Sequence, residues 1–182
     1  IRDRASDAPD LFQKAKQAAF YAKQNGKNRI QVYEGNIDAE RRNKETGYEQ
    51  VAPTVYALVA AIDAKDSFTF QHSTNVSQYA VLLAQKLGLP GDDIHTVKVA
   101  GLLHDIGKIG IPESILKKAG KLTNEEYEIM KSHVQKSIEM IHYLPNMNYV
   151  IPAVVSHHER YDGKGYPRGL KGEGIPFLGR IL

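Results

Sequence analysis

The 182-residue sequence contains no cysteine. This absence excludes a disulfide framework, a thiolate zinc site and a cysteine nucleophile. No apolar run approaches the ~18–20 residues that a membrane-spanning helix requires, and no charged-then-apolar signal pattern follows Ile1. The sequence therefore predicts a cytoplasmic protein, in which any metal chemistry has to use histidine, aspartate and glutamate.

The sequence also lacks a strong excess of charge of either sign. Its 24 lysines and arginines nearly balance its 21 aspartates and glutamates, which leaves a formal net charge of +3. No basic field for binding a nucleic-acid duplex is therefore expected. Hydrophobic residues make up 42% and charged residues 25% of the chain. These fractions are typical of one or two globular domains and exclude a disordered or collagen-like chain.

Composition divides the chain into three stretches. Residues 10–25 are rich in alanine and lysine at helical spacing, Gly26 is placed to end that helix, and residues 28–33 alternate like a short strand. Residues 34–49 are polar and predict a linker or an exposed helix. An exposed helix near residues 37–64 could mediate dimerisation, and the alternative is a solvated linker. From about residue 50 the pattern is almost wholly helical, so the sequence predicts a mainly α fold.

Helical periodicity and helix-end signals predict five helices in the third stretch, over residues 51–66, 69–87, 92–105, 123–143 and 148–160. Asp92 or Asp93 is placed to cap the third of them, and Thr123 with Glu126 has the pattern of a capping box at the start of the fourth. The Gly/Pro-rich residues 161–176 predict one long irregular loop.

Four predicted helices each carry a histidine in line with apolar residues three or four positions away: His72, His104, His133 and His158. The stripe around the first of them consists of Val76, Ala80, Leu83 and Leu87. A single histidine of this kind is more often a core residue with ordinary hydrogen-bond partners than a metal ligand. Four in one small bundle favour a shared metal, because a metal satisfies several buried imidazoles at once.

The neighbours of these histidines strengthen the metal hypothesis. Asp105 directly follows His104, and its carboxylate could bridge two cations. His157 offers a second imidazole beside His158. Imidazole and carboxylate ligands without thiolate suit manganese, iron or zinc.

Lys108 is the fourth residue after His104, so a helix that persists through Gly107 would place its ammonium on the side of the imidazole. There it could hold an anionic phosphate oxygen, and the alternative is a solvated surface lysine. The glycines of residues 161–176 could let backbone amides approach a ligand, or could form ordinary turns. His95 and His142 lack comparable companions and are predicted at the surface or its boundary.

The residues HDIGKIGIP at 104–112 and HHERYDGKGYP at 157–167 together resemble the paired signature of the HD-GYP domain, a bacterial subgroup of the HD metal-dependent phosphohydrolases. The resemblance extends from about residue 50 to the end of the chain and implies an HD-type helical bundle. It also implies a phosphodiesterase that hydrolyses cyclic di-GMP to pGpG and/or GMP in bacterial second-messenger signalling.

The resemblance further implies the residues of the site. The implied metal ligands are His72, His104, Asp105, His133, His157 and His158. Asp105 would bridge two divalent ions, iron or manganese in preference to zinc, and Lys108 would contact the scissile phosphate as a second catalytic residue. Gly165, Tyr166 and Pro167, the GYP residues, would bind the substrate together with Lys108. Phe68 stands where some members have a glutamate for a third metal, which favours a two-metal site.

Both ends of the chain carry further expectations. The family continues past the segment at residues 180–182 into a helix whose aspartate completes the metal site, so the domain is expected to be incomplete at Leu182. Residues 11–33 resemble the helix, turn and strand that end a GGDEF α/β domain. Lys16 stands where an aspartate is common, and the GGDEF signature is absent, so no cyclase activity is expected. The implied organisation is a GGDEF-like end over 1–33, a linker over 34–49 and an HD-GYP domain over 50–182.

Two other functions stay open at this point. A module with an incomplete site could bind cyclic di-GMP or a partner protein, such as a GGDEF domain, without hydrolysing the nucleotide. The presence of all six implied ligands argues against this alternative. The chain could also be an HD-type hydrolase of another nucleotide, against which the GYP residues argue.

Overall fold

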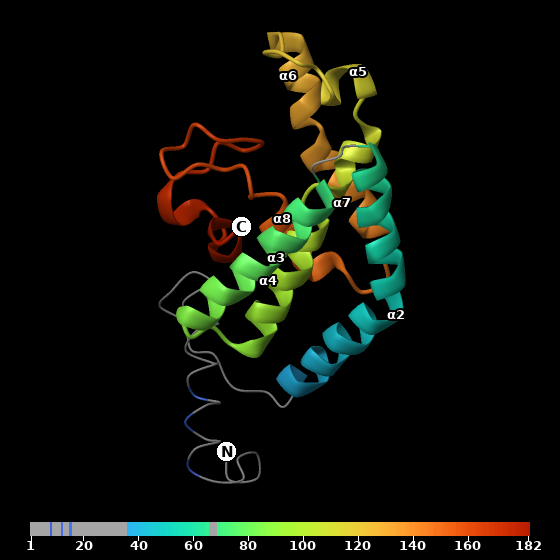
Figure 1. Cartoon of the computed structure of the whole chain (residues 1–182). Helices are drawn as coiled ribbons and strands as arrows, with labels where there is room; N and C mark the ends of the chain where they lie inside the picture. Colours follow the sequence, from blue (N-terminus) through green and yellow to red (C-terminus); the bar gives the residue numbers. More distant parts are fainter. Residues whose placement is uncertain (1–7, 9–11, 13–14, 16–35, 66–68) are drawn as a thin grey trace. The chain divides into compact units, whose positions relative to one another are not determined.

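The computed structural model describes residues 8, 12, 15, 36–65 and 69–182 of the chain. Regular secondary structure in these residues is helical, with no strand (Figure 1). The α-helices are α2 (Asn36–Lys65), α3 (Thr69–Lys86), α4 (Gly91–Leu103), α5 (Glu113–Leu116), α6 (Asn124–Lys131), α7 (His133–His142) and α8 (Ile151–Val154). Short 3-10 helices are η1 (Ile106–Gly110), η2 (Asn148–Val150), η3 (Gly172–Gly174) and η4 (Phe177–Arg180). The predicted mainly α fold is confirmed, whereas the strand predicted over 28–33 and most of the helix predicted over 10–25 lie outside the described residues.

The chain divides into two compact units, Ile1–Lys44 and Glu45–Leu182. The helix α2 runs unbroken from Asn36 to Lys65, so its residues belong partly to the first unit and partly to the second. The helix predicted over 51–66 is therefore longer than expected and takes in residues predicted as a linker or an exposed helix. Pro53 interrupts the helical bonding at the carbonyl of Glu49, and both residues are exposed, so water can replace the missing hydrogen bond.

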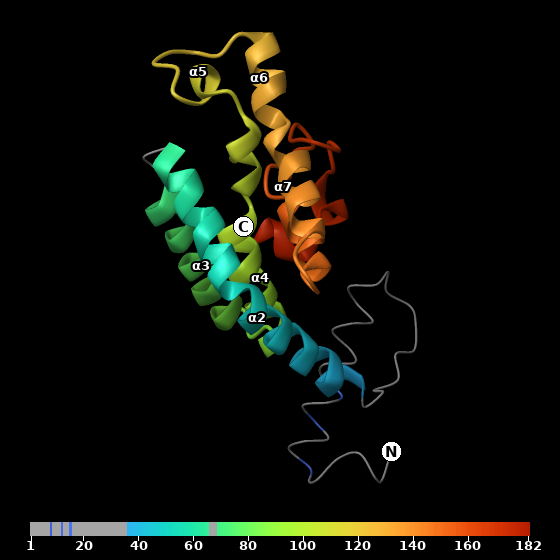
Figure 2. The same ribbon diagram turned by 90° about the vertical axis from the view of Figure 1, so that its right-hand side faces the viewer.

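α3 and α4 form an antiparallel hairpin and lie side by side in both views (Figures 1 and 2). Gly88 lies in the turn between them with a φ of +68°, which glycine adopts at little cost. The two helices approach most closely at Gly101, where an added Cβ atom would lie 2.7 Å from the Cα atom of Ser77. The Ser77 hydroxyl also donates a 2.7 Å hydrogen bond to the carbonyl of Lys98. Small side chains thus set the spacing of this hairpin.

The start of α4 differs from the prediction that Asp92 or Asp93 caps it. Pro90 is the N-cap residue and makes no side-chain cap hydrogen bond. Both aspartates lie inside the first turn instead, where a carboxylate interacts favourably with the positive end of the helix dipole. Asp92 and Asp93 therefore stabilise the start of α4 by their charge and not by capping hydrogen bonds.

The helix predicted over 123–143 is present but is divided at Ser132 into α6 and α7. Its start has the predicted capping box. Thr123 Oγ1 accepts a hydrogen bond from the amide of Glu126 at 3.2 Å, and Glu126 Oε2 accepts one from the amide of Thr123 at 2.7 Å. Two otherwise unpaired amides at the helix start are satisfied in this way.

The helix predicted over 148–160 is present only in its first half, because η2 and α8 cover residues up to Val154 and turns continue to His158. Side chains compete with the backbone for the carbonyls there. The Ser156 hydroxyl donates to the carbonyl of Pro152, and His157 Nδ1 lies 2.5 Å from the carbonyl oxygen of Val154. Periodicity alone did not reveal this competition, so the predicted helix was too long.

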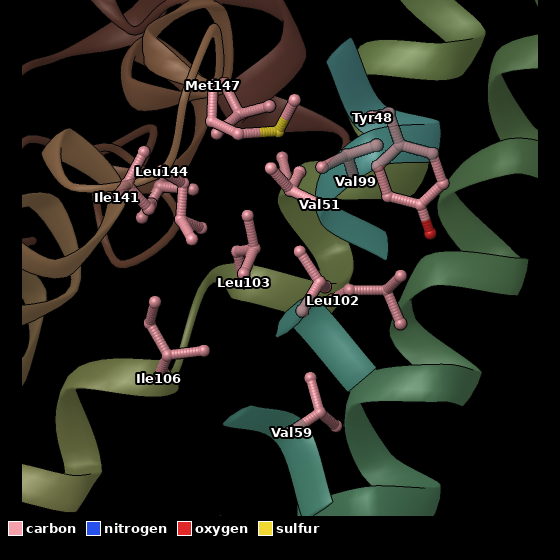
Figure 3. Packing of buried hydrophobic residues seen from close by; sticks show 14 of the residues in the cluster. Tyr48, Val51, Val59, Val99, Leu102, Leu103, Ile106, Ile141, Leu144 and Met147 are labelled. Atoms are coloured by element: carbon pink, nitrogen blue, oxygen red, sulfur yellow. The ribbon is translucent and has the colours of Figure 1, made fainter. Parts of the chain in front are cut away.

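The hydrophobic core lies between α2, α4, α7 and the segment that leads into α8 (Figure 3). α2 contributes one face of buried residues, Val51, Val55, Val59 and Ile62. Leu103 and Ile106 are each 0% exposed and flank His104 and Asp105 along the chain. The core therefore anchors these two polar residues from both sides. No helix among the described residues is both long and apolar enough to cross a membrane.

The close approach at Gly101 provides a test of this packing. We expect Gly101→Ala to lower the free energy of unfolding by about 1–3 kcal/mol, because the added methyl group meets the backbone of Ser77 and forces the helices apart. Gly120→Ala is the matched control, since nothing lies within 4 Å of its Cβ position, and it should change stability by less than about 0.5 kcal/mol. Urea denaturation followed by circular dichroism measures both variants. Equal stabilities would contradict the described packing.

Candidate metal centre

Histidines from several parts of the chain converge on one aspartate in the unit formed by residues 45–182. They form two groups in which the potential ligand atoms all lie within 4.8 Å of one another. One group consists of Asp105, His133, His157 and His158, and the other consists of His72, His104 and Asp105. The structure thus brings together all six residues predicted as metal ligands, and Asp105 belongs to both groups.

Most of these residues lie at helix ends. His104 directly follows α4, His133 is the first residue of α7, and His157 and His158 lie in the turns after α8. The last turn of a helix has carbonyl groups without amide partners inside the helix. Three of the histidines contact such carbonyls.

In each of these contacts, the imidazole Nδ1 lies beside the carbonyl oxygen three residues earlier: His104 with Gly101 at 2.8 Å, His133 with Met130 at 2.7 Å, and His157 with Val154 at 2.5 Å. A carbonyl oxygen only accepts hydrogen bonds, so Nδ1 carries the hydrogen in all three rings. The remaining nitrogen, Nε2, is thereby directed away from the backbone. This arrangement is common for metal-binding histidines, because it fixes both the ring orientation and the tautomer.

The Nε2 atoms of these three histidines face the carboxylate of Asp105. His104 Nε2 lies 3.2 Å from Oδ2, His133 Nε2 lies 3.2 Å from Oδ1, and His157 Nε2 lies 3.9 Å from Oδ1. Asp105 is only 3% exposed. The two carboxylate oxygens therefore point toward different imidazoles in a region that water hardly reaches.

Charge states follow from these surroundings. Burial of Asp105 opposes its ionisation, but His104, His133 and Lys108 outweigh burial and hold the pKa of the carboxyl well below its usual range. Burial lowers the pKa of His157 to about 3 and that of His158 to about 4. Asp105 is thus an anion at neutral pH, and these two histidines are neutral with a lone pair available.

The residues fit a divalent cation. Asp105 Oδ1 is buried and has no hydrogen-bond partner among the described residues. The Nε2 atoms of His133 and His157 lie 3.4 Å apart, beside this oxygen. A neutral imidazole nitrogen and a carboxylate oxygen are both acceptors, and a cation placed among them satisfies them together. Imidazole and carboxylate donors without thiolate are suited to manganese, iron or zinc.

Lys108 reaches the site by a different route from the one predicted. α4 ends at Leu103, so no continuous helix places Lys108 beside His104. Instead η1 turns the chain so that Lys108 Nζ lies 2.8 Å from Asp105 Oδ2. Its side chain is 21% exposed. The ammonium therefore lies at the edge of the centre, between the buried carboxylate and solvent.

Gly107 and Ser137 support the centre and were not predicted as functional. An added Cβ atom at Gly107 would lie 2.0 Å from the carbonyl oxygen of His133, so only glycine allows η1 to approach α7 this closely. The amide of Gly107 donates to Ser137 Oγ at 2.8 Å, and this hydroxyl donates to the carbonyl of His104 at 2.9 Å. Ser137 is 0% exposed. The position of Gly107 between Asp105 and Lys108 in the motif was a sequence signal for its role. The role of Ser137 depends on tertiary structure and had no such signal.

Of the GYP residues, Tyr166 lies directly against the centre. The ring of Tyr166 stacks on the ring of His158 with centroids 4.6 Å apart and an interplanar angle of 26°. The amide of Tyr166 also donates to the carbonyl of His158 at 3.2 Å. Tyr127 contacts Tyr166 edge-on at 6.2 Å, and Lys131 Nζ lies 5.8 Å from the Tyr166 ring centroid. Burial raises the pKa of Tyr166. This tyrosine therefore supports a potential metal ligand.

Gly165 is required by backbone packing. An added Cβ atom there would lie 2.3 Å from the amide nitrogen of Arg160 and 2.5 Å from the Cα atom of Glu159. The Glu159 carboxylate accepts hydrogen bonds from the amides of Arg168 and Leu170, each at 2.8 Å. The loop is thus folded tightly against the turns that carry His157 and His158, and Pro167 lies on its exposed side.

His72 lies at the outer edge of the centre. Its ring centroid is 5.5 Å from that of His104, but the residue is exposed. The apolar stripe predicted around it is only partly buried, because Leu83 and Leu87 are 45% and 53% exposed. Periodicity indicated one face of α3 correctly, but no described residue covers the far end of that face enough to bury these leucines.

The two remaining histidines are outside the centre, as predicted. His95 is partly buried and contacts Tyr149, with Nε2 3.1 Å from the tyrosine hydroxyl. His142 is exposed and contacts the side chain of Asn148 at 2.9 Å.

Comparison with known proteins gives a consistent result. Residues 57–182 match the sequence profile of the HD domain family. The chain is 40% identical over 136 residues to the cyclic di-GMP phosphodiesterase response regulator RpfG of Xanthomonas campestris pv. campestris, which covers 74% of this chain and 36% of the relative. It is 38% identical over 139 residues to 3'3'-cGAMP-specific phosphodiesterase 1 of Vibrio cholerae, which covers 76% of this chain and 32% of the relative.

A third relative is a cyclic di-GMP phosphodiesterase of Thermotoga maritima, 40% identical over 140 residues, with 75% of this chain and 38% of the relative covered. The chain thus spans about a third of the length of these relatives.

The shared position of Asp105 provides a test of the centre. We expect Asp105→Asn to reduce Mn(II) affinity by at least about 100-fold, because the neutral amide removes the charge and one acceptor oxygen that both ligand groups use. Asp162→Asn is the control, since Asp162 lies on the surface and pairs with Arg160. Elemental analysis after dialysis against Mn(II) measures bound metal, and circular dichroism checks folding. Wild-type metal content in a folded Asp105→Asn protein would refute the assignment.

Proposed function

The chain belongs to the HD domain family, and on this premise we propose that the protein is a metal-dependent phosphodiesterase that hydrolyses cyclic di-GMP to pGpG and/or GMP. Relatives named as cyclic di-GMP phosphodiesterases, at up to 40% identity, support this substrate. The proposal includes a role in bacterial second-messenger signalling in the cytoplasm.

One observation carries the proposal: Asp105 is the common member of two ligand groups, and a lysine ammonium lies on the same carboxylate. A single structural metal needs one closed set of ligands. Two groups that share a bridging carboxylate suit two ions side by side, an arrangement typical of enzymes that cleave phosphate esters.

The proposed cofactors are two divalent ions, iron or manganese in preference to zinc. Asp105, His133, His157 and His158 would hold one, and His72, His104 and Asp105 would hold the other. When bound, such ions supply Lewis acidity toward phosphate oxygens and lower the pKa of a water molecule. The buried carboxylate of Asp105 would hold the two ions side by side, because each of its oxygens faces a different set of imidazoles.

Lys108 is the proposed second catalytic residue. Its ammonium is held 2.8 Å from Asp105 Oδ2 and is still 21% exposed, so an incoming phosphate can reach it. Positive charge fixed in advance at that place stabilises the negative charge that develops on phosphate oxygens during cleavage. Asp105 and Lys108 would thus position the scissile phosphate against the ligand groups.

Gly165, Tyr166 and Pro167 are proposed to bind the substrate beside Lys108. His158 covers one face of the Tyr166 ring, and Lys131 lies over the ring at 5.8 Å. We expect a nucleotide to contact the part of this half-buried side chain that stays exposed. The adjoining Pro167 is exposed and would limit the space for the nucleotide on that side.

A second candidate substrate is 3'3'-cGAMP, because relatives at 36–40% identity are named as phosphodiesterases specific for it. Both nucleotides present two phosphodiester groups on a cyclic backbone, so the same centre could cleave either.

The proposed domain organisation is a GGDEF-like end over 1–33 and a linker over 34–49, followed by the HD-GYP domain over 50–182. A GGDEF domain or a second copy of the chain is the proposed partner.

Product analysis by chromatography tests the proposed reaction. The protein is purified without oxygen, loaded with Mn(II) or Fe(II), and offered cyclic di-GMP, 3'3'-cGAMP and a mononucleotide ester, both as this chain and as a version extended past Leu182. We expect pGpG or GMP from cyclic di-GMP. Nucleotide binding without product in both metal-loaded forms would instead indicate a binding module, and preferred cleavage of the mononucleotide ester would indicate a different hydrolase.

A lysine substitution tests the role of Lys108. We expect Lys108→Met to lower kcat by about 100-fold or more while bound metal stays unchanged, because the ammonium stabilises the transition state and is not a metal ligand. Lys164→Met, which removes a charge from an exposed position of the loop over residues 161–176, should keep kcat within about threefold of wild type. Steady-state kinetics with elemental analysis gives both quantities. Equal kcat values in the two variants would contradict the assigned role.

A further inference from the structure

Lys65, the last residue of α2, contacts the segment that carries Lys108. Its ammonium donates hydrogen bonds to the carbonyl oxygens of Ile109 and Ile111, each at 2.5 Å. These partners lie 44 and 46 residues further along the chain. The contact therefore joins the end of α2 directly to η1 and to the residue that follows it.

The carbonyls that Lys65 binds are ones that η1 cannot satisfy itself. They lie at the C-terminal end of a five-residue 3-10 helix, where carbonyl groups lack partners inside the helix. A cation at this end also complements the negative end of the helix dipole. Hydrogen bonds from a charged donor are among the stronger ones in proteins. Lys65 thus supplies an interaction that this short segment lacks.

η1 is held at both of its ends. Near its start, the amide of Gly107 donates to Ser137 Oγ at 2.8 Å and ties the segment to α7. Near its end, Lys65 ties it to α2. Lys108 lies between these two attachments and points to Asp105 Oδ2 at 2.8 Å. The backbone position of Lys108 is therefore set from two sides, by two different helices.

The contact is not part of the hydrophobic core that anchors α2. Val55, Val59 and Ile62 of α2 are at most 1% exposed and hold the helix in the core. Lys65 is only half-buried and follows this anchored face. Its substitution should therefore leave α2 folded and in place. The role of the lysine can be separated from the stability of the fold for this reason.

We propose that Lys65 is a positioning residue for the catalytic lysine: it fixes η1 from the α2 side, so that the state of α2 sets where the ammonium of Lys108 lies. α2 begins at Asn36, in the range of the first compact unit, and runs unbroken to Lys65. A signal that shifts or loosens the end of α2 would thus reach η1 and Lys108 through the side chain of Lys65, a polar link separate from the core packing of α2. The kinetic part of this inference rests on the proposed phosphodiesterase function.

The experiment compares Lys65→Met, which keeps the aliphatic chain without the donors, with Lys65→Arg, which keeps a charged donor. Lys117→Met is the matched control, because this lysine is 51% exposed and pairs with Glu113 on the surface. We expect Lys65→Met to lower kcat by about 10- to 100-fold, as a small misplacement of a catalytic group does. KM and bound metal should change by less than about threefold. Lys65→Arg should recover most of kcat, and Lys117→Met should match wild type.

Hydrogen exchange gives a readout that needs no catalysis. The amide of Lys108 donates to the carbonyl of Asp105, the N-cap residue of η1, and the amide of Ile111, its C-cap residue, donates to the carbonyl of Lys108. In Lys65→Met these amides should exchange at least about tenfold faster than in wild type or Lys117→Met, because one attachment of the segment is lost. If the wild-type protein has no activity, the proposed function fails while the exchange measurement still decides on the contact.

A double-mutant cycle tests the link to α2. Ala61 and Ala64 are exposed residues near the end of α2, and their replacement by glycine loosens the helix without touching the centre. We expect Ala61→Gly/Ala64→Gly to lower kcat in the wild-type background and to have no further effect in Lys65→Met. Additive effects would overturn the coupling. The positioning role itself would be overturned if Lys65→Met had the kcat and the amide exchange rates of wild type. It would also be overturned if Lys65→Met lost both bound metal and thermal stability and Lys65→Arg did not restore them.

Discussion

An ionised carboxylate is buried at a high cost unless cations or hydrogen-bond donors replace the water that it loses. Asp105 imposes this condition on the structure around it. One of its oxygens faces His104 and Lys108, and the other faces His133 and His157. This requirement accounts for the way four segments meet at one carboxylate. The end of α4, η1, α7 and the turns after α8 each bring one of these side chains to Asp105.

The places where the helices end are as important as the helices themselves. α4, α6 and α8 each end so that a carbonyl of the last turn meets the Nδ1 atom of a histidine three residues later. A longer α8 would use the carbonyl of Val154 for its own backbone, and a continuous α6–α7 helix would do the same with that of Met130. The short α8 and the division at Ser132 are thus the local structure that orients the imidazoles.

Periodicity predicted the helical fold and indicated four histidines in line with apolar residues, His72, His104, His133 and His158, with Asp105 and His157 as their chain neighbours. The resemblance of two motifs implied the full set of six ligands, which the structure brings together, and the contact of Lys108 with the scissile phosphate. The end of α4 at Leu103, the contact of Ser137 with η1 and the stacking of Tyr166 on His158 were not predictable. Each depends on which segments meet in space, and periodicity contains no information about that. The roles of the site residues in metal binding and catalysis, and the boundaries of the domains, remain predictions.

The distribution of the candidate ligands along the chain also affects folding. His72, His104, His133 and His158 belong to segments separated by tens of residues, so the centre exists only after α3, α4, α7 and the turns after α8 have met. An ion bound there acts as a cross-link that closes several long chain loops at once. Its binding free energy is added to the stability of the whole unit, by about 2.7 kcal/mol when the free ion is at 100 times its Kd. The concentration of available metal would then determine the fraction of newly made chain that is folded, in addition to the activity of the folded protein.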